Sequence, residues 1–234
     1  MGVIAVGLST YPDSGFSRTR SDAIREIAEH EGGASSNAQL DRAARTYDAT
    51  VKYFNRFLWK FNVLTEDITL SGVDSNSEVS LSNRIKAPQR MVLIDSDGVQ
   101  RNEPVRYMRL KDYLYRDPSE VGTYAIPRAY TFQNLHETGK VRFIPRLDTA
   151  NLTYPKARLW YYRYIEVSSQ LGGRLNVPED VEQAIVEWAT AKFIAKVRTH
   201  GEAAAAMRSA QDTFLDIEQE HREYGEIEVR EEPY

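Results

Sequence analysis

The stretch that decides the fold class runs from residue 174 to 193 and reads RLNVPEDVEQAIVEWATAKF. Pro178 suits the first position of a helix, because its ring fixes φ and its missing N–H would have no partner there. Glu179 and Asp180 follow, where the positive end of the helix dipole favours acids. Apolar residues, among them Trp188 and Phe193, then cover more than one side of the cylinder. The pattern predicts a helix that is buried on several faces.

Two more helices are predicted before residue 62 and a last one near the end of the chain. Apolar and small residues recur every three or four positions between Asn37 and Phe61, which predicts one long amphipathic helix. Ser21 and Asp22 can cap a shorter helix before it, and we expect the two to pack as a hairpin. Beyond Gly201 a narrow apolar stripe, typical of contact between helices, consists of Ala203, Met207, Ala210, Phe214 and Ile217.

Short alternating runs separated by turn residues predict strands from residue 63 to about 170. One hairpin is expected around the turn at 95–98. The run RLWYYRYI at 158–165 alternates, so that Trp160 and Tyr162 face one side and Leu159 and Tyr161 the other. We interpret it as a strand buried on both sides, in the core or at a subunit interface. Stacking of nucleic-acid bases on these aromatics is the alternative, which the negative net charge disfavours.

These elements predict an α+β fold, in which the two ends of the chain form a helical bundle and an antiparallel β module is inserted between them. The expected boundaries are 1–62 and 176–234 for the helical body and 63–175 for the β module. With 234 residues, 41% of them hydrophobic, the chain can bury a sizeable core. It has no cysteine, which excludes disulfides and thiolate metal sites. No apolar run approaches the length of a membrane span, so no membrane partner is expected.

The formal charge of −4 is unevenly distributed along the chain. Residues 218–234 hold seven acids and two arginines, a net −5, which leaves +1 for all the other residues. A nearly neutral body with an acidic end is not typical of a protein that grips duplex DNA, because phosphates call for a strongly basic face. The acidic end is either a solvated terminus or a segment that becomes ordered on a partner.

No motif in the sequence predicts catalysis. The four histidines are far apart, and none has another histidine at a spacing suited to a shared metal ion. Neither a nucleophile elbow nor a phosphate-binding loop occurs. We therefore predict no catalytic residue, no metal and no cofactor. A cell-wall-degrading hydrolase is the alternative, because a glycosidase needs only two carboxylates and their sequence spacing carries no information.

In their order along the chain, several segments resemble the head-to-tail adaptor, or connector, proteins of tailed bacteriophages, including the tail tubular adaptors of short-tailed phages. The resemblance lies in segments 22–28, 54–59, 122–132 and 139–145, in the aromatic strand through Tyr164, and in the helix start at 175–179. It covers nearly the whole chain. The sequence departs from the family pattern in the spacing of Gly122 and Pro127 and in residues 7–16.

This resemblance implies a structural virion protein of the neck or tail that is assembled in the host cytoplasm. It implies a homo-oligomer, a dodecameric ring beneath the portal protein, whose helical body forms the channel wall and whose β module meets the tail or nozzle proteins. Viral DNA would pass through the lumen during ejection without specific binding. Another head- or tail-completion protein is a further alternative.

Two sets of residues are candidates for assembly contacts. The apolar residues of the last two helices would contact a neighbouring subunit, and this set consists of Trp188, Phe193, Met207, Phe214 and Ile217. A C-terminal arm from about residue 224 would bind the portal, and its candidate residues are Tyr224, Ile227, Val229 and Tyr234.

Overall fold

A computed structural model describes residues 18–30, 36–71, 78–81, 84–115, 126–133, 139–168 and 173–222. The fold is α+β. The described chain forms two compact units, one within 63–164 and the other from the residues up to Asn62 together with those from Ile165 onward. The second boundary therefore lies earlier than the expected one after residue 175, because Ile165 and Leu175 are buried in the core of the helical unit.

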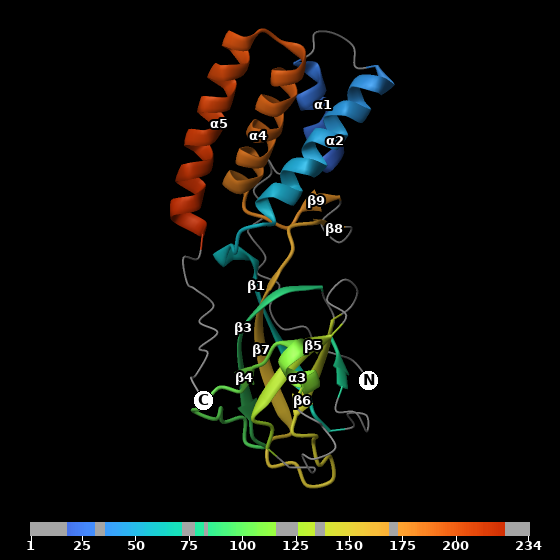
Figure 1. Cartoon of the computed structure of the whole chain (residues 1–234), viewed down its shortest axis with the longest axis vertical. Helices are drawn as coiled ribbons and strands as arrows, with labels where there is room; N and C mark the ends of the chain where they lie inside the picture. Colours follow the sequence, from blue (N-terminus) through green and yellow to red (C-terminus); the bar gives the residue numbers. More distant parts are fainter. Residues whose placement is uncertain are drawn as a thin grey trace. The chain divides into compact units, whose positions relative to one another are not determined.

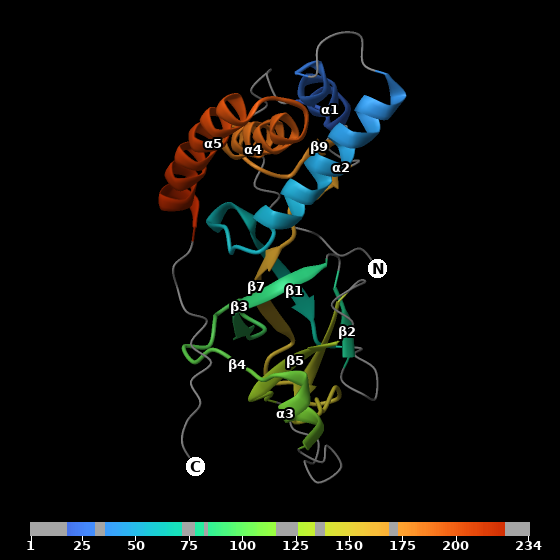
Figure 2. The same ribbon diagram turned by 45° about the horizontal axis from the view of Figure 1, so that its top comes forward.

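The helical unit contains α1 (Arg20–Glu29), α2 (Asn37–Phe54), α4 (Glu179–Val197) and α5 (His200–His221), with the short elements η1 (Lys60–Asn62), β8 (Val167–Ser168) and β9 (Arg174–Leu175). Helix α4 contacts α1, α2 and α5, and both Figure 1 and Figure 2 show α5, α4 and α2 side by side. The Arg20 guanidinium lies 2.8 Å from the Asp48 carboxylate, which joins the start of α1 to the later part of α2. These two helices form the expected hairpin.

Local hydrogen bonds set helix ends that differ from the predicted ones. Thr19 caps α1 instead of Ser21: its hydroxyl accepts from the N–H of Asp22, and the Asp22 carboxylate accepts from the N–H of Thr19. Helix α2 ends at Phe54 rather than Phe61, because the Trp59 indole N–H donates to the Phe54 carbonyl at 2.8 Å and turns the chain back into the core. Pro178 lies one residue before the first helical residue of α4.

The second unit contains two main sheets. The order in the three-stranded sheet is β1 (Val63–Thr69), β7 (Lys156–Arg163) and β3 (Ile85–Ile94), and in the four-stranded sheet β2 (Glu78–Ser80), β6 (Lys140–Ile144), β5 (Ala129–Gln133) and β4 (Arg106–Tyr107). The pairings in these sheets are antiparallel except that between β4 and β5, which is parallel. The prediction of a purely antiparallel module is wrong there, because the connection between the two strands includes α3 (Leu110–Tyr115), which allows a crossover.

Strand β7 shows how the β unit forms its core. Leu159 and Tyr161 are fully buried between the sheets, with neighbours such as Met91, Tyr130 and Phe143. On the other side, Tyr162 is buried, but Trp160 and Tyr164, the residue just after β7, are only half-buried, each beneath an arginine guanidinium. Burial in the core on both sides is therefore confirmed for Tyr162 and wrong for Trp160 and Tyr164, which arginine side chains rather than a second apolar layer cover within this chain; their burial at a subunit interface stays a prediction.

Candidate functional site

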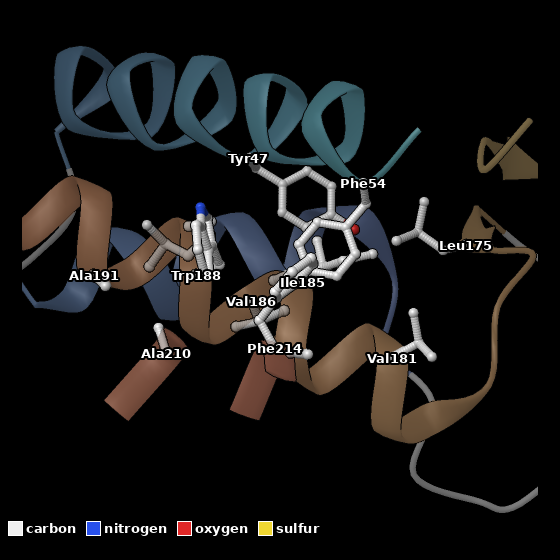
Figure 3. Packing of buried hydrophobic residues seen from close by; sticks show 14 of the residues in the cluster. Tyr47, Phe54, Leu175, Val181, Ile185, Val186, Trp188, Ala191, Ala210 and Phe214 are labelled. Carbon is white, nitrogen blue, oxygen red and sulfur yellow. The ribbon is translucent and has the colours of Figure 1, made fainter. Parts of the chain in front are cut away.

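Phe214 of α5 lies at the centre of an aromatic cluster in the helical unit. Its ring centroid is 5.2–6.3 Å from those of five other rings, and the complete cluster consists of Tyr53, Phe54, Phe57, Trp59, Trp188 and Phe214. Figure 3 shows Phe54, Trp188 and Phe214 between α2, α4 and α5. The Phe214 ring lies edge-to-face with Phe54 and Trp59, and such pairs add to the free energy gained by burying the rings. The cluster therefore connects the N-terminal and C-terminal helices within one chain.

The structure corrects the expected role of four candidate interface residues. Trp188, Phe193, Phe214 and Ile217 are 8%, 1%, 6% and 6% exposed and belong to the core of the helical unit. They were expected to contact a neighbouring subunit, but the apolar faces of α4 and α5 are covered by each other and by α2. Met207 is half-buried against the same core. The arm residues Tyr224, Ile227, Val229 and Tyr234 lie outside the described residues.

Basic and aromatic side chains lie together where α2 packs against α4. We call this surface the α2–α4 seam, and it consists of Thr46, Tyr53, Arg56, Trp188, Lys192 and Lys196. Tyr53 stacks on Trp188 with a centroid distance of 5.3 Å and an interplanar angle of 12°. The Lys192 ammonium lies 5.1 Å from the Tyr53 centroid and 5.6 Å from that of Trp188. A half-buried ring, Tyr53, and the buried Trp188 beneath it thus form the floor of the seam, and cations lie over them.

Two other cations extend this surface. The Arg56 guanidinium lies 5.9 Å from the centroid of the Tyr53 ring. Lys196 is exposed, and its ammonium donates to the Thr46 hydroxyl at 3.5 Å. Burial lowers the pKa of Lys192, and the positive charges of Lys196 and Arg56 lower it further. Three positive charges are therefore held close together on this part of the helical unit.

The seam has no countercharge within the described part of the chain. None of its three cations forms an ion pair with a carboxylate of the described residues. The indole N–H of Trp188 is buried and has no hydrogen-bond acceptor there. Unpaired cations over an aromatic floor can bind an anionic group that also carries apolar surface. The seam is therefore the candidate interaction site of the helical unit.

Sequence reasoning missed this site, although one signal was present. Lys192 and Lys196 are four residues apart, as are Lys52 and Arg56, and this spacing places the members of each pair on one side of their helix. Neither pair predicts that α2 and α4 meet. Tyr53 and Lys192 are far apart in sequence, and only the tertiary packing brings them together.

Among the described residues, Asp180, Glu220 and His221 could together hold a metal ion, since their ligand atoms lie within 4.8 Å of one another. His221 Nε2 lies 2.7 Å from Asp180 Oδ2, and this hydrogen bond ties the first turn of α4 to the end of α5. The Phe61 ring packs edge-on against the imidazole. The absence of a metal stays a prediction.

An open, polar depression in the β unit is lined by two acids, Asp95 and Glu103, together with Tyr154 and neighbouring loop residues. Asp95 accepts hydrogen bonds from the backbone N–H groups of Asp97 and Val99, and Glu103 pairs with Arg101 at 2.6 Å. Both carboxylates thus stabilise the loop that carries them. This arrangement gives no support to the hydrolase alternative.

No protein-family model matches the chain, and no curated protein is similar enough to count as a match. Among the described helices, none combines the length and the apolar character that crossing a bilayer requires.

Proposed function

We propose that this chain is a structural subunit of a phage head-to-tail adaptor, forming a dodecameric ring beneath the portal that joins the tail or nozzle proteins. The observation that supports this most is the division into two compact units. The helical unit is built from both ends of the chain, and the β unit is inserted between them. This is the organisation that the resemblance to adaptor proteins implies. Each unit has its own core and can offer a separate surface to a different partner.

The distribution of charge also supports a connecting role. Residues 63–164 contain fifteen basic and twelve acidic residues, a net +3, whereas the rest of the chain sums to −7. Complementary charge favours the correct partner and suppresses wrong ones. Two units of opposite net charge therefore suit a protein that contacts two different assemblies.

On this proposal the chain catalyses nothing and belongs to the neck or tail of the virion. Viral DNA passes through the ring during ejection. The excess of acids in the helical unit repels phosphates, so DNA slides past without adhering.

The test mixes the purified protein with portal rings of the same phage and measures the mass of the products. We expect a complex in which a dodecamer of this chain is added to each portal ring. The protein alone is assayed for cell-wall hydrolysis, and no turnover is expected. Turnover together with the absence of any portal complex would contradict the proposal, and binding to tail components alone would favour the alternative of another completion protein.

A further inference from the structure

We propose that the acidic C-terminal segment, residues 223–234, docks on the α2–α4 seam of its own chain. The docking itself does not depend on the adaptor function. Its consequence does: if the proposed function holds, the docked segment keeps the seam covered until the portal takes up the segment.

The seam requires an occupant that is both anionic and apolar. Its three cations repel one another and form no ion pair with a carboxylate of the described residues. A bound anion would reduce this electrostatic repulsion. In its floor, Tyr53 is half-buried and offers the exposed part of its ring as apolar surface, whereas Trp188, on which it stacks, is buried. A simple anion would neutralise the charges but would leave the rings uncovered.

The C-terminal segment has this combination of properties. Residues 223–234 contain five glutamates and one arginine, a net −4. Ile227 and Val229 alternate with Glu226 and Glu228, so that an extended segment presents an apolar side and an acidic side. We expect the apolar side to cover the exposed part of the Tyr53 ring, and the glutamates to lie at the rim beside the cations.

The position where the described chain ends places the segment next to the seam. The Arg222 guanidinium lies 4.8 Å from the centroid of the Phe57 ring, and the Phe57 and Tyr53 centroids are 5.5 Å apart. An extended segment of this length reaches about 40 Å. Helix α5 ends beside Asp180, and Lys196 lies sixteen residues further along α4, about 24 Å along the helix axis, which is within this reach. Tethering raises the effective concentration to the millimolar range and so favours the chain's own seam over that of a second copy.

The first experiment measures binding of a labelled synthetic peptide, residues 223–234, to a chain shortened to residues 1–222, by fluorescence anisotropy at low salt. We expect saturable binding that weakens as salt is added, because both partners are charged. The double substitution K192E+K196E should weaken it by about tenfold or more. K196E alone, at an exposed position, should show a smaller loss if the double variant folds poorly.

The matched control is R25E+R208E, which reverses two exposed cations elsewhere in the helical unit and should leave binding within about twofold of the parent chain. A peptide carrying E226K+E228K should bind the K192E+K196E chain better than the natural peptide does. The proposal would be overturned if the control and the seam variants lost the same amount of peptide affinity, or if the peptide did not bind to residues 1–222.

The second experiment asks whether the contact lies within one chain. The full chain should bind the labelled peptide about tenfold more weakly than residues 1–222 do, at any protein concentration and with the mass of a monomer, because its own segment occupies the seam. Equal binding by the full and shortened chains, or weaker binding only where the full chain dimerises, would overturn docking within the chain. Portal binding is measured separately, so a failure of the adaptor function would leave these results unchanged.

Discussion

At the scale of single residues, Glu182 is a buried carboxyl group of the helical unit whose ionisation is unfavourable. It is 6% exposed in the first part of α4, and one carboxylate oxygen has no hydrogen-bond partner within the described residues. Burial raises the pKa of Glu182, and a hydrogen bond from the Arg18 backbone together with the positive charges of Arg18 and Arg174 offsets this rise only in part. The ionised form of Glu182 therefore costs stability.

We predict that Glu182→Gln stabilises the protein at pH 7 by about 1 kcal/mol, because the amide cannot ionise. The folded state holds the Glu182 proton more tightly than the unfolded state, whose pKa is about 4.3. The stability that protonation of Glu182 contributes is therefore fully present below about pH 4.3, and it is lost as the pH rises through the pKa of the folded state. Urea unfolding of both proteins at pH 4 and pH 7 checks this: the difference should be near zero at pH 4. A difference that does not change with pH would contradict it.

At the scale of secondary-structure elements, periodicity located the helices but not their ends. The stripe from Leu40 to Phe54 predicted α2 correctly, because a helix that packs on one side needs apolar residues at that spacing. The same stripe continues through Leu58 and Phe61, where the chain is no longer α-helical. Asn55, which exchanges hydrogen bonds with Ile165 at 2.7 and 2.8 Å, belongs to a contact distant in sequence that periodicity cannot detect.

The cap of α1 gives a prediction at this scale. Thr19→Ala should lower the free energy of unfolding by about 1 kcal/mol, because it removes the acceptor for the N–H of Asp22. Ser21→Ala is the matched control, since Ser21 is an exposed residue inside the helix and should change stability by less than about 0.5 kcal/mol. Chemical denaturation compares the two. If Ser21→Ala lowered the free energy of unfolding more than Thr19→Ala does, Thr19 would not be the cap of α1.

At the scale of the whole molecule, the two cores predict two separate responses to mutation. Phe214→Ala should cost the helical unit about 3–5 kcal/mol, and Phe143→Ala should do the same to the β unit, since both side chains are buried in their own clusters. Leu215→Ala is the control beside Phe214, because Leu215 is 50% exposed.

Amide hydrogen exchange, measured for each segment of the chain, tests this prediction. In the Phe214 variant, amides of α4 and α5 should lose protection while those of β6 and β7 keep theirs, and the Phe143 variant should show the reverse. The Leu215 variant should exchange like the parent chain. An equal loss of protection in both units from either substitution would show that they unfold as one.

The sequence by itself determined the α+β class, the four long helices and most strands, because hydrophobic periodicity and turn residues act over a few positions and are visible locally. Only the tertiary structure decided that Phe214 and Trp188 lie in the core of one chain rather than on a surface between copies. It also decided that Tyr53 and Lys192 share a seam. The choice of which apolar helix faces pack against each other depends on contacts between segments distant in sequence, and a local sequence pattern does not predict those contacts.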